Sequence, residues 1–356
     1  MKIGVIAGST YPSSPNNYGS EVMAAVLADE LGRKHDVMLI AASGSIKGRY
    51  KLKLLPNLKG NLSYQIESLV MNYFDELKEC DYVIDMSPLC MYCEELYFWH
   101  REMLDKQVVV YSRNGTNAFN PRVPVNMNLH GVCLSYAARN EITKNFNIPS
   151  NLLHVIPYGI RLDWYRFKRK KKDYLLYLGA PRKEKGIFKI LEIAKRLPNE
   201  HFIFAWRAIN DEHKRTQEEF LKKAKKLSNV EFIELPEGEE HFRAKVRLYQ
   251  NAKALIKADL KSYIEALGLV SIEAMSCGTP VITASHGANP EVVANGKTGF
   301  LCKSIKEYVN AIKNVHVIEP KACRRHVEIN FSSRRFAESY LKLYEEIKNE
   351  NVLNNS

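Results

Sequence analysis

The sequence predicts an α/β protein with two domains, each built on a parallel sheet with helices on both faces. Short apolar runs typical of buried strands alternate with helical segments, and this alternation indicates parallel sheets. A basic run at residues 166–172 interrupts the alternation, which then starts again. A chain of 356 residues is also too long for one ordinary hydrophobic core. We therefore expect domains at residues 1–160 and 161–332, joined by a hinge within 157–172.

In the first half, short apolar runs predict strands, and longer segments with one apolar side predict helices. In the first helix, Val22, Ala25, Val26 and Ala28 share that apolar side. The expected strands are 3–7, 37–41, 82–86, 108–111, 132–134 and 153–156, and the expected helices are 21–31, 66–77 and 137–145.

The second half repeats this pattern. A loop with several cations, residues 179–186, separates its first strand from its first helix. Gly278 and Pro280 are expected to end a short helix that starts at Leu269. The expected strands are 174–178, 201–206, 230–233, 254–258 and 281–283, and the expected helices are 187–197, 217–227, 242–250, 269–275, 305–314 and 336–347.

The composition is that of a soluble globular protein, with 46% apolar and 26% charged residues. No apolar run approaches the length that spans a bilayer. The first eight residues are interpreted as a buried strand rather than a signal peptide. The seven cysteines are scattered, and Cys90 and Cys93 form a lone Cys-x-x-Cys without a second pair at zinc spacing. We therefore expect reduced thiols and a cytoplasmic location.

The net charge of +12 favours anionic partners, such as nucleotides, anionic lipid headgroups or nucleic acid. Basic clusters occur at residues 47–53, 166–172, 222–226 and 243–247. None of them lies in a nucleic-acid-binding motif, so we expect no nucleic-acid partner. The cluster 47–53 predicts peripheral docking on an anionic membrane surface, and the simplest interpretation of 166–172 is a solvated linker.

Glu265 is the first candidate ligand-binding residue, because it follows the expected strand 254–258 in a loop that also supplies Ser262. In open parallel sheets, ligands bind at the carboxyl ends of the strands. Glu273 lies about one turn into the next helix and is expected to face the same crevice. The two glutamates would grip the two ends of a sugar nucleotide. Spacing alone leaves an alternative open, a strand–turn–helix unit with two solvated glutamates.

A diphosphate would fit between these glutamates. The backbone N–H groups of Gly268, Leu269 and Val270 lie at the start of a helix, where they lack acceptors within the helix. Such groups form a ready site for an anion. Gly268 also lets a ligand approach the backbone closely.

The run from Glu265 to Ile282 resembles the Glu–seven–Glu signature of retaining GT-B glycosyltransferases of the family 4 type. Leu267 replaces the usual aromatic residue, and the run from Gly287 to Leu301 matches the segment that follows in the family. The resemblance implies the GT-B fold, with two doubly wound Rossmann-like domains facing across a cleft. It also implies that a last helix at 333–350 packs back on the first domain and that the second domain holds the donor.

The resemblance also implies a role for each candidate residue. Glu265 would bind hydroxyls of the donor sugar, with Ser262 nearby, and Glu273 would bind the ribose hydroxyls of the nucleotide. Lys185 and Arg182 would neutralise the leaving diphosphate, an effect that is typically the largest in catalysis. Arg182 would substitute for the family arginine, whose position holds alanine here. The alternative is a solvated basic loop.

Two residues of the first half extend the resemblance. Gly19 opens a Gly-Ser-Glu run that resembles the family's Gly-Gly-x-Glu, where the backbone approaches the donor diphosphate and the acceptor. Taken alone, Gly19 is a helix-start residue. Arg113 stands where many members carry a histidine, and its planar guanidinium suits a phosphate or an acidic acceptor. The alternative is a surface arginine.

The predicted function is transfer of a hexosyl group from a nucleotide-diphosphate sugar to an acceptor that the sequence does not identify, a reaction of EC class 2.4. The resemblance implies retention of the anomeric configuration. The Asp-x-Asp motif of the other glycosyltransferase fold is absent from the sequence, so we expect no metal and no other cofactor. Two alternatives stay open: a nucleotide-sugar 2-epimerase, and a non-catalytic protein that binds nucleotide sugars.

Overall fold

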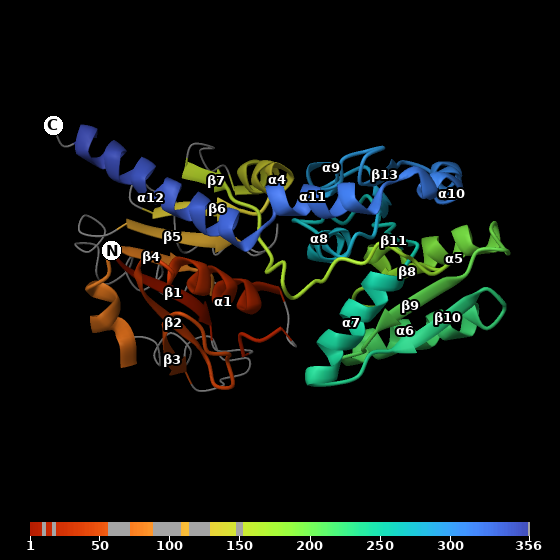
Figure 1. Cartoon of the computed structure of the whole chain (residues 1–356), viewed down its shortest axis with the longest axis horizontal. Coiled ribbons are helices and arrows are strands. Elements are labelled where there is room, and N and C mark those ends of the chain that lie inside the picture. Colours follow the sequence, from red (N-terminus) through yellow and green to blue (C-terminus); the bar gives the residue numbers. More distant parts are fainter. Residues whose placement is uncertain are drawn as a thin grey trace. The chain divides into compact units, whose positions relative to one another are not determined.

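The computed structural model describes residues 1–8, 12–15, 19–55, 72–87, 108–113, 129–146 and 152–354. These residues form two compact units (Figure 1). Unit 1 comprises Met1–Ile160 with Ser332–Ser356, and unit 2 comprises Arg161–Phe331. Each unit contains one parallel sheet with helices packed against it, so the predicted class of two doubly wound α/β domains is confirmed. Within the described part of the chain, no helix is both long enough and apolar enough to cross a membrane.

The sheet of unit 1 has the strand order β3-β2-β1-β4-β5-β6-β7, and all neighbouring strands are parallel. Its inner strands are continuous apolar runs, as expected for strands that are covered on both faces. The strands are β1 (Lys2–Gly8), β2 (Asp36–Ala42), β3 (Lys51–Leu55), β4 (Tyr82–Asp85), β5 (Val108–Arg113), β6 (Leu129–Cys133) and β7 (Leu153–Val155). The labelled helices are α1 (Gly19–Leu31), α4 (Tyr136–Phe146) and α12 (Ser333–Asn354), and residues 72–78 are also helical. Residues 66–71 of the expected helix 66–77 lie outside the described residues.

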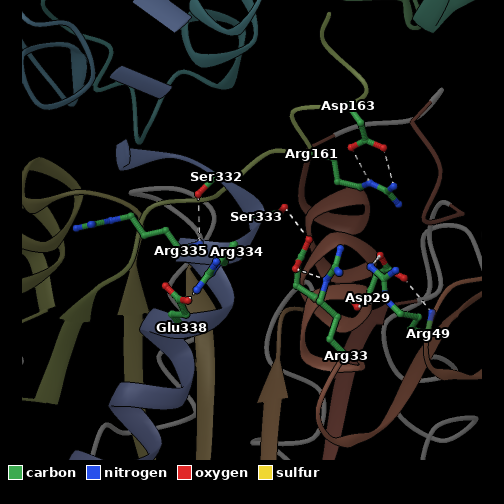
Figure 2. Close-up of polar contacts among 11 residues, drawn as sticks. Asp29, Arg33, Arg49, Arg161, Asp163, Ser332, Ser333, Arg334, Arg335 and Glu338 are labelled. Carbon is green, nitrogen blue, oxygen red and sulfur yellow. Dashed lines mark hydrogen bonds and ion pairs between the residues drawn. The ribbon is translucent and has the colours of Figure 1, made fainter. Parts of the chain in front are cut away.

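The last helix, α12, belongs to unit 1, although the whole of unit 2 precedes it in the sequence. It packs against α1 and contacts β5. The hydroxyl of Tyr82 in β4 donates to the backbone carbonyl of Tyr340 in α12 at 3.2 Å. At the start of α12, Oγ of Ser333 donates to Oε1 of Glu30 in α1 at 3.0 Å (Figure 2). Apolar packing and polar contacts therefore both attach α12 to the first domain.

The edge strand β3 is not predicted from the sequence, because lysines alternate with leucines there. Charged side chains are typical of edge strands, where they discourage pairing with another chain. The cations of this strand and of the segment before it form ion pairs inside unit 1: Lys51 with Asp36, Lys53 with Glu76, and Arg49 with Asp29 (Figure 2). These pairs weaken the argument that the cluster 47–53 docks on an anionic membrane.

The sheet of unit 2 has the strand order β10-β9-β8-β11-β12-β13 and is also parallel throughout. Its strands are β8 (Leu175–Leu178), β9 (Phe202–Trp206), β10 (Val230–Glu234), β11 (Ala254–Ile256), β12 (Val281–Ala284) and β13 (Gly299–Cys302). Its α-helices are α5 (Ile187–Lys195), α6 (Asp211–Ala224), α7 (Glu239–Asn251), α8 (Leu269–Ser276), α9 (Asn289–Val292), α10 (Ile305–Asn314) and α11 (Pro320–Asn330).

Two groups of helices cover this sheet. Helices α5, α6 and α10 bury a core with β9, in which the ring of Trp206 lies 4.8 Å from that of Phe220. Helix α8 packs against α7 and α11, and α7 and α8 also contact the sheet. Layers on both faces explain why β9 is a run of five buried apolar residues.

Several features of unit 2 differ from the sequence prediction. Helix α6 begins six residues earlier than expected, because Oδ1 of Asn210 accepts the N–H of His213 and caps it there. Strand β13 and helix α11 are not predicted from the sequence. The run 166–172 is not simply a solvated linker, because the ammonium of Lys171 donates to the carbonyl of Cys277 at 2.9 Å and to Oγ1 of Thr279 at 2.8 Å.

Candidate functional site

The candidate site lies at the carboxyl ends of three adjacent strands of unit 2, β8, β11 and β12. The chain leaves β8 toward a 3-10 turn at Lys183–Lys185, and it leaves β11 into the loop 257–268. Because the strands are parallel neighbours, these segments meet at one edge of the sheet. Three charged side chains come together there: Lys185, Lys257 and Glu265.

Glu265 is buried, with 8% of its surface exposed, and it lies between two ammonium groups. Its Oε2 accepts from Nζ of Lys185 at 2.8 Å and from Nζ of Lys257 at 3.1 Å. Burial by itself raises the pKa of a carboxyl group, but the charges of Lys257 and Lys185 outweigh burial and lower the pKa of Glu265 to about 2. The side chain is therefore a buried carboxylate that stays ionised at neutral pH.

Two glycines fix the backbone around Glu265. The carbonyl of Glu265 accepts the N–H of Ala288 at 2.9 Å, next to Gly287, which has a φ of 61°. A Cβ at Gly287 would lie 3.0 Å from the backbone nitrogen of Glu265. Gly268, with a φ of 83°, caps the N-terminus of α8, and a Cβ there would lie 3.1 Å from Nζ of Lys257. Both positions combine a positive φ with little room, so they favour glycine.

The start of α8 lies where the sequence predicts it. Leu269 and Val270 are its first two residues and Gly268 is its N-cap. The first N–H groups of a helix have no acceptor within the helix, and the helix dipole places partial positive charge there. The chain thus joins a helix N-terminus, where an anion would be favoured, to the loop that carries Glu265.

Lys185 is held by its neighbours on both sides. The turn that carries it ends at Gly186, whose φ is 73° and where a Cβ would lie 1.9 Å from the carbonyl oxygen of Ala258. Its ammonium lies 4.4 Å from the ring centroid of Tyr263. Burial lowers the pKa of Lys185, but the charge of Glu265 outweighs burial and raises the pKa overall. Lys185 is therefore a fixed cation at the site.

Arg182 and Ser262 lie at the margin of this cluster. The guanidinium of Arg182 pairs with Glu184 and lies 5.9 Å from the ring centroid of Tyr263, with 41% of its side chain exposed. Ser262 is exposed in the turn between Leu260 and Tyr263. The structure thus brings Lys185 and Glu265 into contact, whereas Arg182 contacts a different carboxylate.

Glu273, on α8, is buried with 7% of its surface exposed, and its oxygens are occupied by neighbours. Its Oε1 accepts from the hydroxyl of Tyr165 at 2.7 Å and from Nζ of Lys245 at 2.9 Å. Its Oε2 accepts from the hydroxyl of Tyr249 at 2.8 Å. Burial and the nearby carboxylate raise the pKa of both tyrosines, so both hydroxyls remain donors. The alternative of two solvated glutamates is therefore wrong.

Sequence reasoning missed Lys257, the second partner of Glu265, and all three partners of Glu273. Lys257 had a signal, because it is a lysine inside the apolar run 254–258. No signal in the sequence pointed to the partners of Glu273, because Tyr165, Lys245 and Tyr249 come from segments distant from α8 in the sequence.

The candidates of unit 1 are described only in part. Gly19 is the first residue of α1, and Arg113 is the last residue of β5, at the carboxyl end of that strand. The side chain of Arg113 lies outside the described residues, as does the Cys90–Cys93 pair. Among the residues that the structure describes, no three His, Cys, Asp or Glu side chains are grouped so as to hold a metal ion.

Residues 163–329 match the family model described as "Glycosyl transferases group 1". This half of the chain belongs to that family. The match includes β8 to β13 and every residue of the Lys185, Lys257 and Glu265 cluster. The site at the carboxyl ends of β8, β11 and β12 is therefore a site of a glycosyl transferases group 1 domain.

Curated relatives match about half of the chain. Spore coat protein SA of Bacillus subtilis is 28% identical over 190 residues, which are 49% of this chain and 49% of that protein. The O-antigen chain mannosyltransferase RfbU of Salmonella typhimurium is 27% identical over 201 residues, 55% of this chain and 53% of that protein. The chain thus spans about half the length of the curated relatives it matches.

Similarity in fold extends over nearly the whole chain. The crystal structure of HepE from Anabaena in complex with UDP-glucose aligns with a TM-score of 0.73 at 16% identity, and the alignment covers 97% of this chain and 100% of that one. This likeness shows that the two units together have the GT-B fold.

Proposed function

We propose that the chain is a glycosyltransferase that moves a hexosyl group from a nucleotide-diphosphate sugar to an acceptor, with retention of configuration and without a metal or other cofactor. The observation that carries this proposal is the place of Glu265. It is an ionised carboxylate between two ammonium groups, in the loop that leads into the N-terminus of α8. An acceptor of hydroxyl hydrogen bonds beside a site for an anion suits a ligand that combines a sugar with a diphosphate.

In the proposed reaction, the bond between the anomeric carbon and the diphosphate oxygen breaks, and a bond forms between that carbon and an acceptor oxygen. The nucleoside diphosphate leaves with the bonding electrons, and the acceptor loses its proton to the leaving phosphate or to water. Lys185 and the N–H groups of Leu269 and Val270 stabilise the charge that grows on the diphosphate. Both lysines contact Oε2 of Glu265, so we assign the sugar hydroxyls to Oε1.

Glu273 would bind the ribose of the nucleotide in this proposal. Tyr165, Tyr249 and Lys245 already contact its two oxygens, so the ribose hydroxyls must share these oxygens or displace a partner. Lys245 is the least buried of the three, and we therefore expect its contact to rearrange. In unit 1, we propose Gly19 and Arg113 as contacts of the diphosphate or the acceptor.

UDP-glucose is the first donor to test, because the structure of HepE that shares this fold contains it. RfbU, which matches 55% of the chain, is named a mannosyltransferase, so GDP-mannose is a second candidate donor. Nucleotide-sugar 2-epimerase activity, the alternative from the sequence, is not favoured by these relatives. Incubation with UDP-glucose alone would reveal it as a change of the sugar without release of UDP.

The deciding experiment measures binding and then turnover. Binding of UDP-glucose raises the midpoint of thermal unfolding by mass action, with about 2.7 kcal/mol of stabilisation at one hundred times the Kd. Release of UDP, with water as the acceptor of the glucosyl group, is then followed for the wild type and for Glu265→Ala. We expect the variant to remain folded and to lose a hundredfold or more in rate, as is typical when an electrostatic contact of the transition state is removed. Similar rates for the two proteins would refute the role of Glu265.

A cytoplasmic location and peripheral docking on anionic lipid also stay predictions. Sedimentation with vesicles of phosphatidylserine and phosphatidylcholine tests docking. Binding that weakens as salt is added supports it, because screening removes charge attraction, and absence of sedimentation contradicts it.

A further inference from the structure

Lys257 is a charged residue at a position that is almost inaccessible to solvent. It directly follows β11, and only 4% of its side chain is exposed. Its N–H donates to the carbonyl of Ile282 at 2.9 Å, and its carbonyl accepts from the hydroxyl of Tyr308 at 2.7 Å. These contacts fix the backbone on both sides of the side chain. An ammonium group buried in this way is costly unless its charge is balanced.

Three acceptors surround the ammonium of Lys257, which has three N–H donors. Nζ lies 3.1 Å from Oε2 of Glu265, 3.4 Å from Oδ2 of Asp259 and 3.3 Å from Oδ1 of Asn289. Asn289 in turn donates to Oδ2 of Asp259 at 3.3 Å. The missing side chain at Gly268 leaves the space that the ammonium fills. The protein itself thus supplies an acceptor for each N–H donor of the Lys257 ammonium.

Lys185 contacts the same carboxylate oxygen from a different kind of position. Its side chain is 20% exposed, against 4% for Lys257, and it lies on a turn rather than at the end of a buried strand. A ligand can therefore reach Lys185 more easily than Lys257. The two lysines balance two carboxylates, Asp259 and Glu265, so that removing Lys185 from Glu265 still leaves Glu265 with a cation.

We propose that Lys257 is a positioning residue of the donor site, which keeps Glu265 ionised and in place when Lys185 leaves it to bind the diphosphate. This inference rests on the proposed function. Lys185 exchanges one anion for another when the donor arrives, and Lys257 keeps its contact throughout. Glu265 then presents a charged oxygen to the sugar at the moment when its other cation has moved. Lys257 itself touches neither donor nor acceptor.

The test variant must not leave Asp259 as an unbalanced buried charge. We therefore choose Lys257→Met with Asp259→Asn, and Asp259→Asn alone as the matched control. Release of UDP from UDP-glucose is measured between pH 5 and pH 8.5. The wild type and the control keep their rate toward acid pH, whereas in the double variant the acid limb of kcat/KM moves upward by about one pH unit or more, because Glu265 then ionises less readily.

Binding of UDP distinguishes the role of Lys257 from that of Lys185. UDP carries the diphosphate but no sugar, so it does not depend on Glu265 in the proposed arrangement. Lys185→Met weakens binding of UDP by about tenfold or more, the effect of losing a charged contact. The double variant at Lys257 and Asp259 binds UDP within about threefold of the wild type, a difference smaller than that of one charged contact. A loss of UDP binding equal to that of Lys185→Met would overturn the proposal.

The ionisation of Glu265 can also be followed without any ligand. In protein labelled with ¹³C at the glutamate carboxyl carbon, the signal that disappears in Glu265→Gln belongs to Glu265. In the wild type this signal stays constant from pH 8 to pH 5, and in the double variant it titrates in that range. A constant signal in both proteins would refute the role of Lys257. If the double variant does not fold, Lys257→Gln with Asp259→Asn keeps an N–H donor and serves the same comparison.

Different results would refute the proposed function and the role of Lys257. A wild type that binds neither UDP and UDP-glucose nor GDP and GDP-mannose would refute the proposed function, and with it the place of Lys257 in a donor site. A wild type that binds and releases UDP, with an acid limb that the double variant leaves in place, would refute the role of Lys257 alone.

Discussion

The hydroxyl of Tyr249 donates a hydrogen bond to Oε2 of Glu273 at 2.8 Å in the interior of unit 2. On the other oxygen of the same carboxylate, Tyr165 and Lys245 lie at 2.7 and 2.9 Å. Glu273 is on α8, Tyr249 and Lys245 are on α7, and Tyr165 lies in the segment that opens unit 2. One buried carboxylate therefore ties three segments together, next to the loop that carries Glu265.

Tyr249→Phe removes one hydrogen bond to this carboxylate and keeps the ring. We expect the free energy of unfolding to fall by about 1.5 to 3 kcal/mol, the usual contribution of a hydrogen bond to a charged group. Tyr165→Phe is the matched control with a smaller expected loss, because Oε1 keeps Lys245. Urea denaturation of the three proteins measures the difference. A Tyr249→Phe protein as stable as the wild type would show that Tyr249 is not a structural partner of Glu273.

The second prediction concerns the stability contributed by Glu265 and its dependence on pH. Its folded-state pKa is lowered to about 2, against an ordinary value of 4.5. A group whose pKa is lower in the folded state contributes stability that is fully present above the unfolded pKa and is lost as the pH falls toward the folded pKa. The total is on the order of 3 kcal/mol, of which about 1 kcal/mol is lost by pH 4.

The measurement for Glu265 compares the wild type with Glu265→Gln. Urea midpoints of both proteins are recorded between pH 7.5 and pH 4. The advantage of the wild type is constant above pH 6 and shrinks below about pH 5, where Glu265 is protonated in the unfolded chain. An advantage that grows toward acid pH would mean that the folded protein holds the carboxyl group in its neutral form.

The sequence is a good guide to the sheets of this protein and a poorer one to its irregular edges. Strands such as β9 are continuous apolar runs, because both faces of the sheet are covered, and such runs are visible in the sequence. Strand β3 escapes prediction because its lysines balance carboxylates at a sheet edge, a relation that depends on tertiary structure. Helix α11 escapes because only Cys323 and Val327 of its residues are buried, which leaves a weak apolar pattern.

In the candidate site, too, some residues could be predicted from the sequence and others could not. Glu265, Gly268 and Lys185 belong to local motifs whose spacing has a physical meaning, so they could be named before the structure. The charge balance around Lys257 could not, because Asp259 lies in the loop after β11 whereas Asn289 approaches from the start of α9. A lysine in an apolar run is a hint that carboxylates surround it, but the sequence does not say which ones.

The third prediction compares the contributions of Lys185 and Arg182 to binding of the diphosphate. From the sequence, both residues are expected to contact it. In the structure Arg182 pairs with Glu184 and has 41% of its side chain exposed, whereas Lys185 is enclosed beside Glu265, with 20% exposed. Arg182→Ala is expected to change the Kd for UDP by less than about threefold, since an exposed ion pair contributes little and its cation is well solvated. Lys185→Met is expected to raise that Kd by about tenfold or more. Isothermal titration calorimetry with UDP measures both, and equal losses would place Arg182 on the diphosphate after all.

The last prediction uses two glycines with the same backbone conformation and different surroundings. Gly186 has a φ of 73° and Gly296 a φ of 74°. An alanine at either position pays for the left-handed conformation, about 1 to 2 kcal/mol. At Gly296 nothing lies within 4 Å of the added Cβ, whereas at Gly186 the Cβ would lie 1.9 Å from the carbonyl oxygen of Ala258. Gly186→Ala must therefore also displace the turn that carries Lys185.

We accordingly expect Gly296→Ala to lower the free energy of unfolding by that conformational cost alone and to leave the Kd for UDP unchanged. Gly186→Ala is expected to lose at least about 1 kcal/mol more, within the range for an overpacked interior, and to weaken UDP binding because Lys185 moves with the turn. Urea denaturation and calorimetry on the two variants give both quantities. Equal stability of the two variants would mean that the turn relaxes freely. Unchanged UDP binding by a destabilised Gly186→Ala protein would mean that the position of Lys185 does not depend on the packing of Gly186 against Ala258.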